Sequence, residues 1–127
     1  MLLVDDNPLF LEEAGAWLSR QAEVEVVGTA TSASEGLALA ARLRPRVVLM
    51  DVALPGLNGI EATRRLKLSP NAPAVLILTL YGDAAYRAAA AAAGAEEFLC
   101  KSELATELLP SLRRICRPVS ERGEVPE

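Results

Sequence analysis

The most constraining feature of this 127-residue sequence is the alternation of short apolar runs with longer segments of helical pattern. Continuous apolar runs of this length are typical of parallel strands that are covered on both faces. Five strand–helix repeats predict right-handed crossovers and one α/β domain with a doubly wound parallel sheet. The runs are "LLV" at 2–4, "VEVVGTA" at 24–30, "RVVLMD" at 46–51, "PAVLILT" at 73–79 and "EFLCK" at 97–101.

The segments between the runs carry helix start and stop signals, chiefly polar caps at their first residues and Pro or Gly after their last. In the last helix, Pro110 predicts a late start or a kink, because proline lacks an N–H and clashes with the preceding turn. The polar stretch 118–127 indicates a tail or linker, which leaves residues 1–117 as the domain. The predicted helices are 8–21 with Asn7 as cap, 32–44 with Ser32 or Ser34, 58–69 with Asn58, 83–94 with Asp83, and 103–116.

Composition excludes several classes of function. The sequence contains no histidine, which removes Ser-His-Asp and Cys-His catalysis. A formal charge of -4 argues against direct binding of nucleic acid by this domain. No apolar run approaches the roughly 20 residues of a membrane span, and the start does not resemble a signal peptide. We therefore expect a cytoplasmic protein in which Cys100 and Cys116 are reduced.

Charged and polar residues stand at the ends of four of the predicted strands. In an open parallel sheet, ligand sites form beyond the carboxyl ends of the strands, so these side chains should converge on one rim. Two carboxylates about 4 Å apart repel by roughly 4 kcal/mol at an effective dielectric near 20, which a divalent cation and a lysine would relieve. The residues are Asp5, Asp6, Asp51, Thr79 and Lys101.

This residue set favours phosphoryl chemistry. Mg²⁺ takes oxygen ligands and commonly joins one or two carboxylates to a phosphate. A carboxylate beside Mg²⁺ can attack phosphorus to form an aspartyl-phosphate, and Lys101 would neutralise charge on the transferred oxygens. Thr79 would donate a hydrogen bond to one phosphoryl oxygen.

Four motifs together resemble the receiver domains of two-component response regulators, the CheY-like family. They are "DD" at 5–6, "MDVALPGLNGIE" at 50–61, "LTLYGD" at 78–83 and "FLCK" at 98–101. The segment from "LTLYGD" onward is most similar to receivers of LuxR-, NarL- and FixJ-type regulators. The resemblance covers residues 2 to about 117 and implies a flavodoxin-like (βα)5 fold with strand order 2-1-3-4-5.

The resemblance also implies roles for individual residues. Asp51 would accept the phosphoryl group, and Asp6 and Asp51 would bind Mg²⁺ directly together with the backbone carbonyl of Ala53. Asp5 would hold a metal-bound water. Thr79 and Phe98 would form the switch, although Phe98 is equally well explained as a core residue. Two departures are Pro110 and Leu80, a bulky residue just after Thr79 where many relatives have a small one.

The implied partners are a sensor histidine kinase or a small phosphodonor, with a homodimer possible after phosphorylation. The helix at Tyr86–Ala93, the strand of Phe98 and the last helix would form the dimer face. As a switch, the domain would be no enzyme beyond phosphoryl transfer to, and hydrolysis from, its own Asp51. An output domain beyond residue 127 would indicate transcription regulation.

Three alternatives stay open at this point. A stand-alone receiver would act through protein–protein contacts alone. A phosphatase with an aspartyl nucleophile would carry a second Asp two residues after the first, where this chain has Ala53. A degenerate receiver used only for dimerisation would have lost the acidic pair, the acceptor or the lysine, and none is lost.

Overall fold

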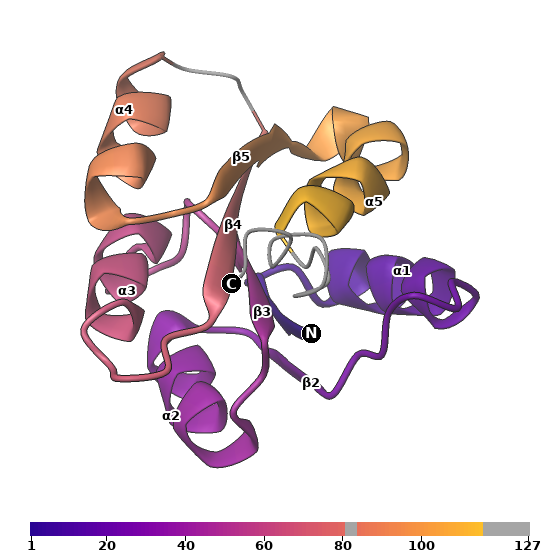
Figure 1. Cartoon of the computed structure of the whole chain (residues 1–127), viewed down its shortest axis with the longest axis horizontal. Coiled ribbons are helices and arrows are strands. Elements are labelled where there is room, and N and C mark those ends of the chain that lie inside the picture. Colours follow the sequence, from indigo (N-terminus) through magenta and orange to yellow (C-terminus); the bar gives the residue numbers. More distant parts are fainter. Residues whose placement is uncertain (81–83, 116–127) are drawn as a thin grey trace, which may run out of the picture.

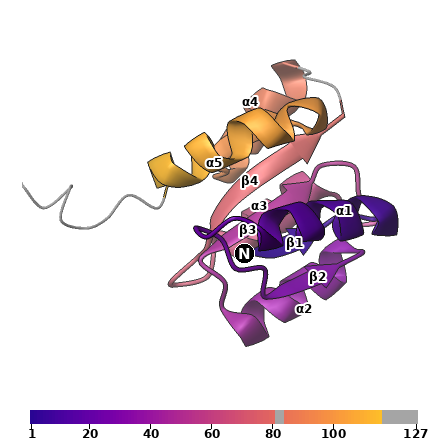
Figure 2. The ribbon, with the colours of Figure 1, turned by 90° about the vertical axis from the view of Figure 1, so that its right-hand side faces the viewer.

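The structure, a computed structural model, describes residues 1–80 and 84–115. Its five strands form one parallel sheet in the order β2-β1-β3-β4-β5, which confirms the predicted flavodoxin-like topology (Figure 1). The helices cover both faces: α2, α3 and α4 lie on one side, and α1 and α5 on the other, in front of the sheet in Figure 2. The elements in chain order are β1 Leu2–Val4, α1 Pro8–Ser19, β2 Gly28–Ala30, α2 Ala33–Leu43, β3 Val47–Asp51, α3 Gly59–Leu66, β4 Ala74–Thr79, α4 Ala84–Ala93, β5 Glu97–Cys100, a 3₁₀ turn Lys101–Glu103 and α5 Leu104–Ile115.

The apolar strands contribute side chains to two separate cores, because successive side chains of a strand point to opposite faces of the sheet. Val48 and Met50 of β3 pack under α2 and α3, whereas Val47 and Leu49 pack under α1 and α5. Every residue of β3 is buried, which explains its nearly continuous apolar sequence. The two cores hold the strands rigidly, so the residues at their carboxyl ends have fixed positions.

Polar caps fix where the helices begin. The Asn7 side chain accepts hydrogen bonds from the backbone N–H groups of Leu9 and Phe10, and Ser32, rather than Ser34, caps α2. Asn58 caps α3 by accepting from the N–H of Glu61. These bonds satisfy backbone donors that have no partner within a helix. The predicted cap Asp83 lies outside the described residues.

The second strand is shorter than its sequence pattern predicts. Only Gly28–Ala30 pairs with β1, whereas the pattern predicts a strand over 24–30. Val24 and Val26 nevertheless pack against the core under α1 and α5. The alternation of apolar and polar residues before β2 therefore reflects burial of these two side chains and not strand pairing. Because β2 is an edge strand with one neighbour, few ladder bonds hold these residues in a strand.

Of the two outcomes predicted for Pro110, a late start or a kink, the late start is wrong and the kink stays a prediction. Helix α5 begins at Leu104 and continues through Pro110 to Ile115. Proline removes the donor for the carbonyl of Thr106, but Thr106 is exposed and water can bind that carbonyl. Leu108 and Leu112 are buried against the sheet, and this packing outweighs the local cost of the proline.

Candidate functional site

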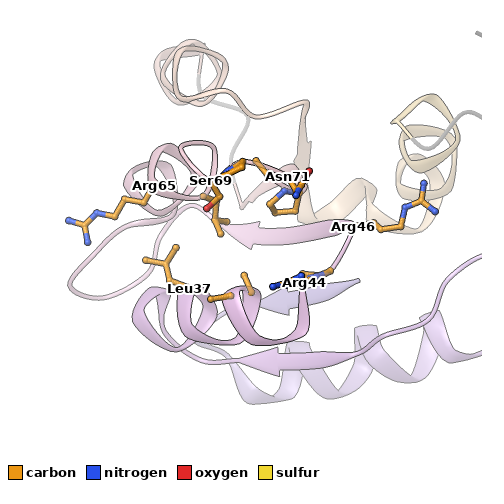
Figure 3. Close-up of a pocket in the computed structure, with 13 residues that line it drawn as sticks. Leu37, Arg44, Arg46, Arg65, Ser69 and Asn71 are labelled. Carbon is orange, nitrogen blue, oxygen red and sulfur yellow. The ribbon is translucent and has the colours of Figure 1, made fainter. Parts of the chain in front are cut away.

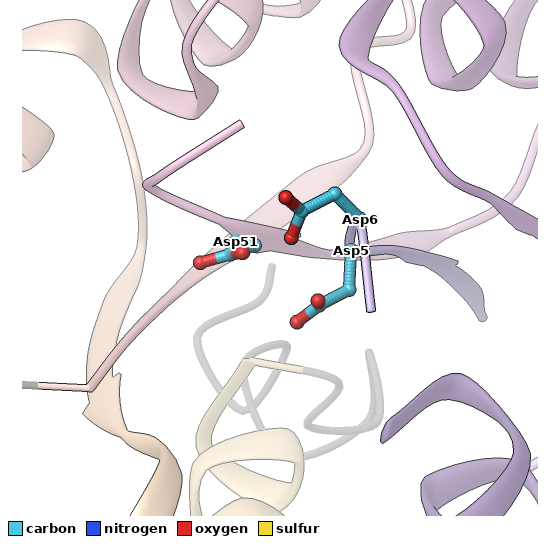
Figure 4. A group of neighbouring side chains, drawn as sticks. All are labelled: Asp5, Asp6 and Asp51. Atoms are coloured by element: carbon cyan, nitrogen blue, oxygen red, sulfur yellow. The ribbon is translucent and has the colours of Figure 1, made fainter. Parts of the chain in front are cut away.

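Three carboxylates meet at the carboxyl ends of two neighbouring strands. Asp5 and Asp6 follow β1, and Asp51 is the last residue of β3, which pairs with β1. One oxygen from each residue lies within 4.8 Å of the others (Figure 4). The convergence of these side chains, predicted from strand ends alone, is therefore confirmed.

Two of the three carboxylates are buried and held by the backbone. Asp5 is 1% exposed and its Oδ1 accepts a hydrogen bond of 2.9 Å from the N–H of Asn7. Asp51 is 5% exposed and its Oδ1 accepts one of 3.2 Å from the N–H of Ala53. Asp6 is exposed. The buried carboxyl groups thus each keep one oxygen, Oδ2, for another partner.

Lys101 supplies the nearest positive charge. Its Nζ lies 2.6 Å from Oδ2 of Asp5 and 3.8 Å from Oδ2 of Asp51. Lys101, which is predicted to relieve the repulsion among the carboxylates, forms its shorter ion pair with Asp5. Asp5 is the more deeply buried of the two, so an unpaired charge on Asp5 would cost more.

The carboxylate cluster remains under-compensated. Burial raises the pKa of Asp51 above its ordinary value of 3.8, and the negative charges of Asp5 and Asp6 raise it further. The N–H of Ala53 and the charge of Lys101 lower this pKa only in part. Since both burial and like charges favour the protonated form, the ionised cluster is electrostatically strained.

The donor set fits a hard divalent cation. Oδ2 of Asp5 is buried and accepts no hydrogen bond from the described residues, although the Lys101 ammonium lies beside it. Three carboxylates with oxygen donors close together match the ligands that Mg²⁺ and Ca²⁺ prefer. The cluster could therefore hold a metal ion. Ala53, whose carbonyl is predicted to join the ligands, is exposed in the loop after β3.

The remaining predicted site residues lie on the two adjoining strands. Thr79 ends β4 beside β3 and is buried, and Phe98 lies on β5. Phe98 is half-buried against the core under α2, α3 and α4, and the guanidinium of Arg87 lies 4.7 Å from the centre of its ring. The side chain of Leu80 is 66% exposed, so in this structure its bulk is turned to solvent.

Sequence reasoning missed Gly59, the first residue of α3. A Cβ at this position would lie 2.0 Å from the carbonyl oxygen of Asp51, so only glycine allows the helix to start so close to β3. The N–H of Gly59 also donates to the carbonyl of Val52 over 3.1 Å. The sequence signal for this close approach is a glycine directly after the helix cap Asn58. The backbone at Gly59 is not left-handed, so the need for glycine comes from the space available and not from the backbone conformation.

Phe10 was also missed, since its helical spacing alone suggests ordinary packing. Its ring lies on α1, and the Nζ of Lys101 is 4.5 Å from the ring centre. This contact joins residues 91 positions apart in the chain, and no local pattern could predict it.

A hollow in the described structure lies away from the carboxylates. It measures about 680 Å³ and opens at the amino ends of β3 and β4, the opposite end of the sheet from the carboxylates. The guanidinium groups of Arg46 and Arg65 line its edge but point away from it (Figure 3). None of the three clustered carboxylates lines this hollow.

The 2-1-3-4-5 sheet, the acidic cluster at its rim and the lysine beside that cluster define a receiver-type signalling domain. The chain belongs to the family of response regulator receiver domains, whose model matches residues 1–113. No helix in the described ranges is long and apolar enough to cross a membrane.

Regulatory proteins are among the similar sequences. The chain is 35% identical to the transcriptional regulatory protein LiaR of Bacillus subtilis over 113 residues, which are 89% of this chain and 54% of LiaR. It is 31% identical to the response regulator protein VraR of Staphylococcus aureus over 117 residues, 92% of this chain and 56% of VraR. The chain thus spans about half the length of these curated relatives, which are signalling proteins.

Solved structures agree with this assignment. A LuxR-family response regulator from Aurantimonas is 35% identical with a TM-score of 0.84, covering 90% of this chain and 81% of that one. The response regulator domain of Thermotoga maritima CheB is 29% identical with a TM-score of 0.82, covering 90% and 92%. The predicted resemblance to LuxR-type receivers is confirmed.

Proposed function

We propose that this domain is a Mg²⁺-dependent phosphoryl switch in which Asp51 is the acceptor. The observation that carries the proposal is the position of Asp51 at the end of β3, between the carboxylates that follow β1 and the hydroxyl of Thr79 that ends β4. Oδ1 of Asp51 accepts a hydrogen bond from the N–H of Ala53, whereas Oδ2 accepts none from the backbone of the described residues.

The other two aspartates are poorer acceptors. Oδ1 of Asp5 accepts a hydrogen bond from the N–H of Asn7, and its Oδ2 forms the shorter of the two ion pairs of Lys101, at 2.6 Å. Asp6 is exposed and has no cation within ion-pairing distance in the described ranges. Of the three aspartates, Asp51 combines burial with an oxygen, Oδ2, whose ion pair with Lys101 is long at 3.8 Å, so the lysine can approach a bound phosphoryl group.

In the transfer step, Oδ2 of Asp51 forms a bond to phosphorus while the bond from phosphorus to the donor's leaving group breaks, and the leaving group keeps the electron pair. Asp6, Asp51 and the Ala53 carbonyl would hold Mg²⁺, with Asp5 acting through a water. When bound, Mg²⁺ would neutralise part of the negative charge on the phosphoryl oxygens. Lys101 would pair with one phosphoryl oxygen and Thr79 would donate to another.

The switch would follow from these contacts. A ligand shifts a two-state equilibrium only through contacts that differ between the states, and the Thr79 hydrogen bond is such a contact. Movement of Thr79 would make room for Phe98 to turn inward, which would alter the face of α4, β5 and α5 and allow two receivers to pair. Arg87, whose guanidinium now lies over the Phe98 ring, would lose that contact.

The setting proposed for this switch comes from its relatives. The donor would be a sensor histidine kinase or a small phosphodonor in the cytoplasm. The domain would carry out no reaction beyond transfer to, and hydrolysis from, its own Asp51. An output domain after the segment 118–127 would contact DNA, as expected for LuxR-type regulators, while this domain, residues 1–117, would not.

The direct test is phosphorylation by acetyl phosphate with Mg²⁺, followed by intact mass spectrometry. Wild type should gain one phosphoryl group that hydroxylamine removes, and neither Asp51→Asn nor wild type in excess EDTA should gain it. Asp6→Asn should bind Mg²⁺ about tenfold or more weakly by calorimetry, since a charged ligand is lost. An adduct that persists in Asp51→Asn would mean that another carboxylate is the acceptor.

A further inference from the structure

We propose that Phe10 is a positioning residue for Lys101. Within residues 1–80 and 84–115, the ammonium of Lys101 lies 2.6 Å from Oδ2 of Asp5, 3.8 Å from Oδ2 of Asp51 and 4.5 Å from the centre of the Phe10 ring. A cation within about 6 Å of a ring centre is attracted by the negative face of the ring. This inference rests on the proposed function, because it assigns how the charge beside Asp51 is held.

Hydrogen bonds of Asn7, the residue that follows the acidic pair, fix the position of the Phe10 ring. Asn7 donates its backbone N–H to Asp5 and accepts, through its side chain, from the N–H of Phe10 at 3.3 Å. One residue therefore fixes both the carboxylate and the first turn of α1 that carries the ring. Phe10 is half-buried against the core under α1 and α5, which limits its rotamers. The side chain of Lys101 is only 15% exposed, so the contact is largely shielded from water.

An aromatic face suits a lysine that must move. In this structure the ammonium is nearer to Asp5 than to Asp51, and it has to approach Asp51 when a phosphoryl group is attached there. A hydrogen-bonding partner would hold it in one direction. The attraction of a ring face changes slowly as the cation slides across it, so Phe10 can keep its contact while Lys101 shifts from Asp5 toward the phosphoryl group.

The consequence is a selective defect when the ring is lost. A shielded cation–π contact corresponds to about a 2- to 30-fold change in an equilibrium constant. Phe10→Leu should weaken binding of beryllofluoride, a phosphoryl mimic, by this factor and slow phosphorylation by acetyl phosphate to a similar degree. Mg²⁺ affinity should change less than about twofold, because every metal-binding carboxylate remains. Phe10→Tyr should restore both properties.

A fluorination series separates the cation–π contact from packing. Phenylalanine with one, two or three ring fluorines is incorporated at position 10, which weakens the negative ring face stepwise while nearly preserving its shape. The logarithm of beryllofluoride affinity should fall steadily with each fluorine. Leu9→Ala, on the exposed side of the same helix turn, serves as the control and should not alter the affinity.

Nuclear magnetic resonance tests the inference without any phosphoryl group. The Lys101 εCH₂ protons should be shifted upfield by the Phe10 ring in wild type, and this shift should disappear in Phe10→Leu. If wild type takes no phosphoryl group on Asp51, the proposed function fails, while the spectrum still decides whether the ring positions the lysine. An affinity independent of fluorination, or an unshifted εCH₂ signal in wild type, would overturn the role of Phe10.

Discussion

The two ends of the sheet use charged residues in opposite ways. At the amino ends of β4 and β5, Lys67 donates to the carbonyl of Pro73 at 2.9 Å and to Oε2 of Glu96 at 2.7 Å, while Oε1 of Glu96 accepts from the N–H of Val75. At the carboxyl ends, three carboxylates cluster, and Lys101 forms ion pairs with Asp5 and Asp51. The first arrangement satisfies its charges within the fold, and the second leaves an excess of negative charge that a ligand can satisfy.

This contrast separates an end whose charges stabilise the fold from an end whose charges could bind a ligand. A charged group with complete hydrogen bonds adds to stability, whereas buried like charges lower it. The amino-end arrangement, which we call the Lys67–Glu96 clamp, ties α3 to β4 and β5. The strained rim is tolerated because the two cores hold the strands beneath it.

The largest effect should come from the rim's backbone. Gly59→Ala would place a Cβ 2.0 Å from the carbonyl oxygen of Asp51, so α3 or β3 must shift. We expect a loss of about 3 kcal/mol or more in the free energy of unfolding, measured by urea denaturation. Gly15→Ala is the matched control: it lies inside α1, and apart from its chain neighbours and the backbone of its own helix no atom lies within 4 Å of the added Cβ. It should stabilise by about 0.5–1 kcal/mol, and equal effects of the two would contradict the close approach.

A smaller loss is expected at the clamp. Glu96→Ala removes the acceptor of the buried Val75 N–H and the partner of Lys67, and should lower the free energy of unfolding by about 1–3 kcal/mol. Glu61→Ala is the control, since it breaks only exposed pairs with Arg64 and Arg65 and should cost about 0.5 kcal/mol. A Glu96 effect no larger than that of Glu61 would make the two ends of the sheet alike.

The smallest effect should have the opposite sign. Asp51→Asn removes one of the repelling charges and should stabilise the metal-free domain by about 1 kcal/mol at pH 7. Because the folded state raises the pKa of Asp51, its protonated form favours folding below pH 3.8, and that contribution is lost as the pH rises through the raised folded-state pKa. The difference between wild type and variant should therefore shrink toward acid.

Urea denaturation at several pH values without metal checks this prediction, and Mg²⁺ should reduce the difference at neutral pH by stabilising wild type more. If Asp51→Asn destabilises the domain at pH 7, the rim is not electrostatically strained.

Patterns in the sequence predicted most of the elements, their parallel arrangement and the strand ends at which the carboxylates gather. Apolar runs of β3 and β4 could be recognised because a strand buried on both faces needs apolar residues at every position. Asp5, Asp6 and Asp51 could be assigned to one rim because the carboxyl ends of parallel strands share an edge. The order of the strands, however, came from the family resemblance, since local patterns do not specify which strands are neighbours.

Tertiary structure decided everything that depends on distances between remote segments. The partner of Lys101 is set by how deeply α1 and β1 bury Asp5, and the need for glycine at position 59 is set by how closely α3 approaches β3. Pro110 is accommodated inside α5 because Leu108 and Leu112 pack on the sheet. The free energy of this packing is not part of any local helix propensity. The contact of Phe10 with Lys101 likewise exists only because the two core layers place α1 beside the end of β5.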